Sequence, residues 1–310
     1  MYVLLFNINN QFREGFILKA IKIAPLNPSA GIFCAQSAVE AANSKFNIKP
    51  FLKWAGGKRW FVHKYLSMFP ANYNRYIEPF LGSAAVFFSL QPKEAILSDV
   101  NEELIETYQA MQVNWKKVLV KLKEHQKNHS REYYYRVRKK HPRSMFSRAA
   151  RFIYLNKTCW NGLFRVNMKG EFNVPIGTKT NILLDTEDFE EISILLGRAE
   201  IIDRDFGDII DQAEKDDLLF IDPPYTVKHN NNGFLKYNGK LFSWDDQVRL
   251  SLSLKRAKGR GVHIVLTNAY HSSIIELYQD SFELIPVARN SVIAGNSIYR
   301  RLCEELIIKG

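Results

Sequence analysis

The chain has 310 residues, of which 46% are hydrophobic and 24% charged, as is typical of one large folded core or of a core with a smaller lobe. No apolar run approaches the roughly 18 residues that span a bilayer, which argues against a transmembrane protein. The three cysteines lie far apart without the spacing of metal ligands, so we expect reduced thiols in a cytoplasm and no metal site.

Residues 1–46 differ in composition from the rest of the chain. Residues 1–24 mix apolar and charged side chains and could form an amphipathic helix, whereas residues 25–44 are rich in Ala, Ser, Asn and Pro, as linkers are. A basic start followed by an unbroken apolar stretch is missing, so a cleavable signal is not expected. We interpret residues 1–46 as an accessory or disordered extension.

The organised chain begins at residues 49–58, KPFLKWAGGK. The two glycines allow the backbone to approach a ligand closely, Lys58 supplies a cation, and Trp54 supplies a flat apolar wall. A glycine turn that caps the next helix, expected at 59–68, would explain the same residues without a ligand.

A strand expected at 75–77 leads into residues 78–88, EPFLGSAAVFF, with Gly82 in the turn. A strand, a glycine turn and a small-residue helix form the first unit of a doubly wound α/β nucleotide-binding fold. A second strand at 95–97 ends before Asp99, which is placed to bind a ribose diol. Asp99 could instead N-cap a helix at 102–111, and the two roles are compatible.

The net charge of +11 is concentrated in the next segment. Between positions 115 and 151, thirteen Lys or Arg stand against two Glu, and the rest of the chain is balanced. Four aromatic residues interleave with this charge: Tyr133, Tyr134, Tyr135 and Phe146. The pattern favours nucleic-acid binding over the alternative of a solvated helix face.

This basic segment should form helices at 114–128, 131–140 and 145–157, followed by a loop, residues 156–167, and a hairpin around Lys169 and Gly170. Arginine pairs with guanine through two hydrogen bonds, and asparagine can contact adenine or phosphate. Trp160 is large enough to fill the gap in a base stack when a base leaves it.

Asp222, Pro223, Pro224 and Tyr225 follow an apolar run at 218–221 that predicts a buried strand. Prolines cannot continue a sheet ladder, so the chain leaves the sheet at the strand's carboxyl end, where α/β folds bind ligands. A strand-ending turn with a surface aspartate is the plainer interpretation.

The same tetrapeptide suits methylation of an exocyclic amine such as adenine N6. The Asp222 side chain and the Pro223 carbonyl could accept both amine hydrogens and direct the nitrogen lone pair at a methyl donor, while Tyr225 stacks on the base. Catalysis would then rest on position and electrostatics, without a covalent intermediate or a metal.

The remaining elements alternate as in an α/β fold. We expect helices at 187–196, 206–213, 244–258 (N-capped by Ser243, with Asp246 as a weaker capping-box partner) and 273–279, strands at 199–203 and 262–267, and a late hairpin of 282–288 with 302–308. The loop at 227–240 could form a lid over a flipped base. On the hairpin connection four residues could touch phosphates: Arg289, Gly295, Asn296 and Arg300.

Four passages (51–58, 78–88, 156–177 and 222–225) resemble, in order, the motifs of Dam-type (D12 class) site-specific DNA adenine-N6 methyltransferases, and the resemblance covers about residues 49–309. It implies a Rossmann-like methyltransferase sheet with an inserted, mainly helical target-recognition domain. The S-adenosylmethionine-binding catalytic domain would comprise 47–113 and 181–310, and the recognition domain 114–180.

The resemblance also implies residue roles. The catalytic residues would be Asp222, Pro223, Pro224 and Tyr225. S-adenosylmethionine would contact Trp54, Lys58, Gly82, Asp99 and Asp222. DNA recognition would use Lys53, Trp160, Asn161, Leu163, Arg165 and Pro175.

The implied activity is methyl transfer to adenine N6 in double-stranded DNA, within GATC, by base flipping and without a metal. Its setting would be the cytoplasm of a bacterial or phage-infected cell, alone or in a restriction–modification pair. The oligomeric state stays open, and a monomer is allowed.

Two departures from the family pattern keep alternatives open. Ala84 stands where many relatives have a second glycine, and its methyl could be absorbed or could weaken cofactor affinity. The other departure is the extension at 1–46, because relatives usually begin just before the motif at 51–54. At the position of Trp160, relatives commonly have Tyr. An RNA adenine methyltransferase and an inactive DNA-binding regulator of the same fold are the alternatives, whereas Asp222 and the basic segment argue against methylation of a protein glutamine.

Overall fold

The computed structural model describes residues 48–228, 242–290 and 302–310, apart from residue 168. The predicted extension at 1–46, most of the predicted lid at 227–240, and Gly295, Asn296 and Arg300 lie outside the described residues. Arg289 was expected on a connection, but its backbone belongs to strand β6 (Glu283–Asn290).

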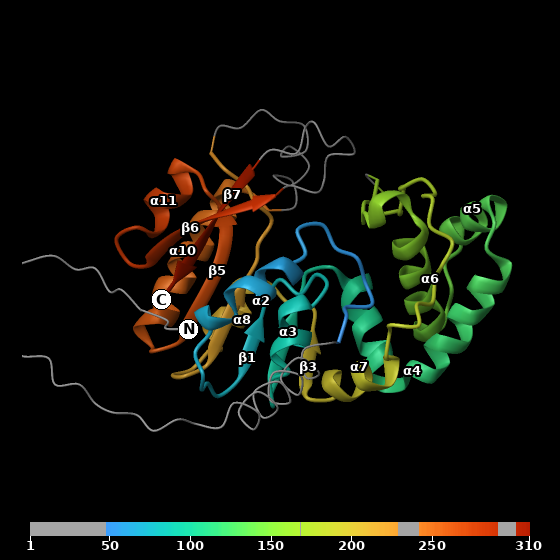
Figure 1. Ribbon diagram of the computed structural model, residues 1–310, viewed down its shortest axis with the longest axis horizontal. Helices are drawn as coiled ribbons and strands as arrows, with labels where there is room; N and C mark the ends of the chain where they lie inside the picture. The colour runs from blue at the N-terminus through green and yellow to red at the C-terminus, as the bar shows by residue number, and fades with distance from the viewer. Residues whose placement is uncertain (1–47, 168, 229–241, 291–301) are drawn as a thin grey trace, which may run out of the picture. The chain divides into compact units, whose positions relative to one another are not determined.

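In the described part of the chain, seven strands form one sheet in the order β3-β2-β1-β4-β5-β7-β6 (Figure 1). The strands are β1 (Tyr76–Glu78), β2 (Ala95–Ser98), β3 (Ala199–Ile202), β4 (Leu218–Ile221), β5 (His263–Ala269), β6 and β7 (Leu302–Lys309). The first five are parallel, and β7 pairs antiparallel with both β5 and β6. The predicted doubly wound, Rossmann-like sheet and its late hairpin are confirmed.

The strand order reverses between β1 and β4. The chain runs outward from β1 to β2 and β3 and then returns to β4 beside β1, with Tyr76 opposite Leu218. In open α/β sheets, such a reversal leaves a ligand crevice at the carboxyl ends of the two strands. The segments after Glu78 and after Ile221 therefore meet at the edge where ligands are expected.

Both faces of the centre of the sheet are buried, because β1, β2 and β4 are buried along their whole length. In β4, Leu218 and Phe220 pack into one hydrophobic cluster, and Leu219 and Ile221 into another on the opposite face. The first cluster is covered by α2 (Arg59–Tyr65), α3 (Ala85–Leu90), α4 (Glu102–Asn128) and α7 (Phe189–Leu196). The second is covered by α8 (Phe206–Asp211), α10 (Trp244–Gly259) and α11 (Ser272–Tyr278).

The helices predicted at 59–68 and 244–258 are both present. A one-turn 3-10 helix, η1 (Leu66–Met68), extends α2. At α10, Ser243 and Asp246 form a complete reciprocal capping box, stronger than the sequence pattern suggested.

The basic segment forms the second half of α4 together with α5 (Arg131–Lys139) and α6 (Met145–Thr158), which group together on the right of Figure 1, whereas the first half of α4 packs against the sheet. The two helices that we expected, at 102–111 and 114–128, are confirmed as the two halves of α4, which meet at a bend at Asn114 (φ −162°, ψ 79°). The Asn114 side chain accepts a hydrogen bond from Lys117 N at 3.1 Å, so it caps the second half of α4.

After α6 come a short 3-10 turn, η2 (Trp160–Gly162), and the predicted hairpin. Val166 and Phe172 face each other in an antiparallel bridge, which confirms the hairpin. Among the helices described, none combines the length and apolarity needed to cross a membrane.

Candidate functional site

The carboxyl ends of β1, β2 and β4 bring the predicted site residues to one edge of the sheet. Asp222 follows β4, Asp99 follows β2, and the turn that contains Gly82 follows β1. This turn is fixed to the neighbouring strand because Leu81 N donates to Ser98 O at 2.9 Å. The doubly wound topology therefore creates the edge that the sequence motifs predicted.

Asp222 is held by two partners on one of its oxygens. Lys58 Nζ lies 2.8 Å from Oδ1, and Thr267 Oγ1 donates to the same atom at 2.9 Å. Burial raises the pKa of Asp222, and the Lys58 ammonium opposes that shift. Among the described residues, Oδ2 has no hydrogen-bond partner, and 19% of the side chain is exposed. One carboxylate oxygen is therefore anchored and the other is available as an acceptor.

Lys58 is a buried cation, with 3% of its surface exposed. Besides Asp222, its ammonium donates to Gly56 O at 3.0 Å, lies 3.8 Å from Glu305 Oε2, and stands 5.0 Å from the centre of the Tyr225 ring. Two carboxylates thus lie within 4 Å of one ammonium.

The ring of Tyr225 is fixed by Glu305 of β7, whose Oε2 accepts a hydrogen bond from the tyrosine hydroxyl at 2.9 Å. Burial, together with both carboxylates, raises the pKa of Tyr225 well above its usual range, so the hydroxyl stays protonated. The Pro224 carbonyl accepts a hydrogen bond from Gln247 Nε2 at 3.5 Å. The Pro223 carbonyl has no hydrogen-bond partner among the described residues, as an acceptor for a ligand requires.

Asp99 accepts hydrogen bonds from Gly82 N at 3.3 Å and from Asn101 N at 3.0 Å. Burial raises the pKa of its carboxyl group to about 6. The helix cap that we considered for Asp99 is wrong, since the Asn101 side chain accepts the hydrogen bond from Leu104 N and caps α4. Asp99 therefore organises the turn that contains Gly82.

Gly82 has a left-handed backbone (φ +47°) and lies against Trp54. A Cβ atom at Gly82 would be 2.7 Å from Trp54 Cδ1, so this close approach requires glycine. The Gly82 carbonyl accepts a hydrogen bond from the Tyr108 hydroxyl at 3.1 Å. The structure thus brings together Trp54, Gly82 and Asp99, which the sequence assigned to one cofactor.

These residues fit the cofactor that the resemblance implies. S-adenosylmethionine carries a sulfonium cation and a ribose diol. Asp222, whose Oδ2 has no hydrogen-bond partner among the described residues, and Asp99, at the end of the next strand but one, place two carboxylates at this edge of the sheet. Within the described ranges, no three His, Cys, Asp or Glu side chains are grouped as metal ligands.

The predicted DNA-recognition residues also come together. Both backbone polar groups of Lys53 bond to the Asn156 side chain, at 2.9 Å (N to Oδ1) and 2.8 Å (Nδ2 to O). The stem of Lys53 packs under Gly162, where a Cβ atom would be 2.7 Å from Lys53 Cδ. Burial, followed by the nearby Lys179, lowers the pKa of Lys53. Lys53 therefore lies against the loop that carries the other recognition residues.

On that loop, Trp160 has 52% of its surface exposed, and its backbone N–H donates a hydrogen bond to the Pro175 carbonyl at 2.9 Å. Asn161 and Arg165 are exposed, with Asn161 in a left-handed conformation (φ 55°) and Arg165 Nε donating to Asn173 Oδ1 at 2.9 Å. Leu163 is half-buried beside them. The loop thus presents aromatic, amide and guanidinium groups to one side.

Trp54 connects this loop to the cofactor turn. Its ring stacks on Phe164 of the loop, with ring centres 5.7 Å apart and an angle of 19°, and its edge contacts Gly82. Phe152 of α6 lies 6.5 Å away on a nearly parallel plane. The two predicted binding regions therefore share one aromatic side chain.

The basic segment is only partly available for a polyanion. Arg148 bonds to Glu106, and Arg151 donates to the backbone carbonyls of Val137 (3.1 Å) and Arg138 (2.8 Å). These two arginines stabilise the helix group. Others interleave with tyrosines as the sequence suggested, for example Arg136, whose guanidinium carbon lies 5.1 Å from the centre of the Tyr133 ring.

Sequence reasoning missed several residues of the site: Thr267, Glu305, Gln247, Asn268 and Asn156. Asn268 Nδ2 donates to Gln247 Oε1 at 3.1 Å and so supports the contact with the Pro224 carbonyl. A signal existed, because polar residues end the apolar strand β5 and a glutamate interrupts the apolar strand β7. Their partners could not be assigned without the register that pairs β5 with β4 and β7.

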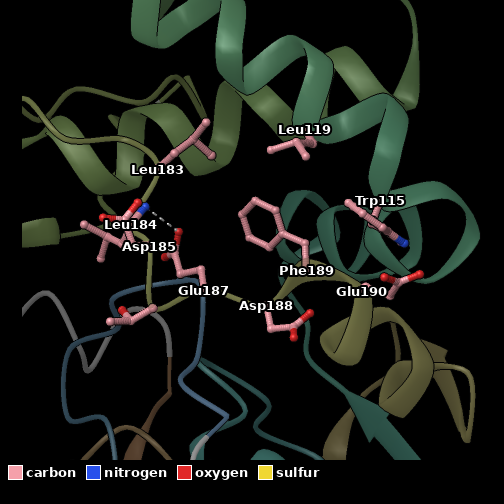
Figure 2. A pocket seen from close by; sticks show the side chains of 10 residues that line it. Trp115, Leu119, Leu183, Leu184, Asp185, Glu187, Asp188, Phe189 and Glu190 are labelled. Atoms are coloured by element: carbon pink, nitrogen blue, oxygen red, sulfur yellow. Dashed lines mark hydrogen bonds between the residues drawn. The ribbon is translucent and has the colours of Figure 1, made fainter.

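A separate hollow of about 400 Å³ lies between α4, α7 and the loop before α7 (Figure 2). In Figure 2 the Phe189 ring lies near the middle of the lining side chains, with Leu119 above it, Trp115 to its right and Asp188 below it. None of its lining residues was predicted to act in catalysis or recognition.

Comparison with known proteins gives one consistent family. The family model described as "D12 class N6 adenine-specific DNA methyltransferase" matches residues 54–293. The type II methyltransferase M1.LlaDCHI of Lactococcus lactis subsp. cremoris is 35% identical over 274 residues, with 86% of this chain and 96% of the relative covered. The type II methyltransferase M.MjaIII of Methanocaldococcus jannaschii is 33% identical, covering 79% and 93%. A DNA adenine methylase of Vibrio cholerae is 31% identical, covering 84% and 95%.

Proposed function

The chain belongs to the D12 class of N6 adenine-specific DNA methyltransferases, and from that membership we propose how it acts. It transfers the methyl group of S-adenosylmethionine to adenine N6 in double-stranded DNA, within GATC, after the adenine has flipped out of the helix. The observation that carries this proposal is the arrangement of Asp222, anchored through Oδ1 by Lys58 and Thr267 with Oδ2 left for a ligand.

Asp222 and Pro223 hold the amine of the flipped base. Oδ2 of Asp222 and the Pro223 carbonyl accept hydrogen bonds from the two N–H groups of the amine. These hydrogen bonds draw the nitrogen lone pair out of conjugation and toward the methyl donor. Lys58 keeps the carboxylate ionised, and the hydrogen bond to Glu305 fixes the Tyr225 ring that stacks on the base. When bound, S-adenosylmethionine supplies the electrophilic methyl group. Asp99, beside Gly82 and Trp54, accepts hydrogen bonds from its ribose hydroxyls.

Lys53, Asn161, Leu163, Arg165 and Pro175 contact the target sequence. Trp160, which is half exposed, fills the gap that the adenine leaves in the stack. Exposed cations of the basic segment bind the backbone phosphates, so DNA affinity should fall with salt.

The bend at Asn114 supports a recognition domain at 114–180 inserted between the catalytic parts at 47–113 and 181–310, with 1–46 as an accessory extension. The enzyme would work on DNA in the cytoplasm of a bacterial or phage-infected cell. A place in a restriction–modification pair is supported by the two relatives named type II methyltransferases.

Expression in a host that lacks N6-methyladenine tests this function. Sequencing of the host DNA should find N6-methyladenine at GATC and nowhere else. Methylated RNA with unmethylated DNA would favour the RNA enzyme instead. Absence of both, with DNA binding retained and no binding of S-adenosylmethionine in calorimetry, would identify an inactive regulator.

A further inference from the structure

Asn156, near the end of α6, joins the first sequence motif to the recognition loop. Its side chain is 1% exposed and forms a two-hydrogen-bond pair with the backbone of Lys53, as one peptide group pairs with another. The same Nδ2 lies 3.4 Å from Gly162 O. One buried amide therefore contacts the backbone of both segments that carry predicted recognition residues.

The pairing requires an amide of this length. Oδ1 accepts from Lys53 N, and Nδ2 donates to the carbonyls of Lys53 and Gly162. An aspartate would set a second acceptor against two carbonyl oxygens, and an alanine would remove the side-chain partner of three backbone groups, of which those of Lys53 are partly buried. The Asn156 side chain does not cap any of the described helices, so its hydrogen bonds to Lys53 and Gly162 account for its burial.

The Lys53 side chain makes its own contacts beside those of its backbone. Its stem lies under Gly162, and its ammonium lies 3.4 Å from Lys157 O at the end of α6. Because Asn156 sets where the Lys53 backbone meets the loop, it sets where this ammonium can reach a base. Trp54, the next residue, is fixed by its own contacts with Phe164 and Gly82 and depends less on the amide.

We propose that Asn156 is a positioning residue for sequence specificity: its amide fixes Lys53 relative to the loop at 160–165, so that the two read neighbouring bases as one surface. This proposal rests on the proposed function, because it assumes that Lys53 contacts the target site. Asn156 itself need not touch DNA.

Initial methylation rates test the proposal on the duplex that the wild-type enzyme prefers and on duplexes with one changed base pair. In Asn156→Ala, discrimination against at least one changed base pair should fall about tenfold or more, the scale of one lost base contact. Asn74→Ala, which removes an exposed amide that donates to Lys215 O, is the matched control and should keep wild-type discrimination.

A double variant distinguishes positioning of Lys53 from a general loss of order in the recognition loop. If Asn156 acts through Lys53, Lys53→Ala/Asn156→Ala should lose no more discrimination than Lys53→Ala alone. In Asn156→Asp, discrimination should recover at low pH, because a protonated carboxyl can again donate to the Lys53 carbonyl, and this recovery should vanish when Lys53 is alanine.

Full discrimination in folded Asn156→Ala, or losses that add in the double variant, would overturn the proposal. If Asn156→Ala does not fold, the isosteric Asn156→Asp decides; if neither folds, Asn156 serves the fold alone and the proposal fails. A wild-type protein that methylates no DNA would instead overturn the proposed function.

Discussion

The ammonium of Lys58 lies 2.8 Å from Asp222 Oδ1 and joins the first motif of the described chain to the tetrapeptide after β4. Lys58 is nearly fully buried, so its charge acts on the carboxylate with little screening by water. This ion pair does not use up the carboxylate, since Oδ2 has no partner among the described residues. The pair therefore opposes the rise in the pKa of Asp222 that burial causes.

Replacing Lys58 with methionine should move the acid limb of the methylation rate to higher pH. Burial raises the pKa of Asp222 and Lys58 opposes the rise, so without Lys58 the carboxylate becomes protonated at a higher pH. Rates measured from about pH 5 to pH 9 check this. Lys64→Met, an exposed lysine of α2, should leave the limb in place. An identical limb in Lys58→Met would show that the ion pair does not control the acceptor.

Binding of S-adenosylmethionine should weaken as the pH falls through about 6, the raised pKa of Asp99. Only the ionised carboxylate accepts two ribose hydroxyls, so affinity should drop by about tenfold per pH unit below that value. Calorimetric titration of wild type and of Asp99→Asn measures the effect, and the pH dependence should be lost in the variant.

Stability without cofactor should show the opposite trend. Because the folded pKa of Asp99 lies above its ordinary value of 3.8, the folded state holds the proton more tightly. The contribution of this group to the free energy of unfolding is therefore present at low pH and is lost as the pH rises toward about 6. For the preceding prediction, an affinity for S-adenosylmethionine that does not change with pH near 6 would contradict the role assigned to Asp99.

Gly82→Ala should destabilise the fold by at least about 2 kcal/mol and abolish cofactor binding. The added methyl would meet Trp54 Cδ1 at 2.7 Å in a backbone with positive φ, which combines overpacking with strain. Gly259→Ala is the matched control, because its Cβ meets nothing within 4 Å and helix propensity favours alanine. Thermal and denaturant unfolding of both variants measure the difference, and equal stabilities would refute the close approach.

Ala84→Gly should leave cofactor affinity within about threefold of wild type. Ala84 does have the left-handed backbone that favours glycine (φ 54°, ψ 30°), but it is fully buried in the hydrophobic cluster beside α3. Its methyl therefore faces the core and not a ligand. Relief of about 1 kcal/mol of strain is offset by the entropy of glycine and the lost methyl burial, so the free energy of unfolding should change by less than about 1 kcal/mol. A tenfold gain in calorimetric affinity would mean that the methyl obstructs the cofactor.

Local sequence patterns predicted the sheet, its helices and the late hairpin because each strand is an apolar run bounded by turn residues. They failed where a decision was not local. Asn101 and not Asp99 caps α4, a choice made when Asp99 turns toward Gly82. The sequence did indicate the bend at Asn114, which separates the helices predicted at 102–111 and 114–128, and the Asn114 side chain caps the second half of α4.

The site was predicted as separate motifs, and the structure supplies the contacts between them. Nothing in the motif at 49–58 indicates that Lys58 meets Asp222 or that Lys53 pairs with Asn156. Glu305 and Thr267 join the site through the registers of β7 and β5, which no local pattern encodes.

Methylation by an Asp222→Ala variant is the most direct measurement. Purified wild-type protein with S-adenosylmethionine and a GATC duplex should produce N6-methyladenine, detected by mass spectrometry of the digested DNA. The variant should bind the duplex with nearly unchanged affinity, because the basic segment is intact, but its rate should fall by at least about a thousandfold. A variant that still methylates the duplex at a rate near that of the wild type would contradict the assignment of the amine acceptor to Asp222.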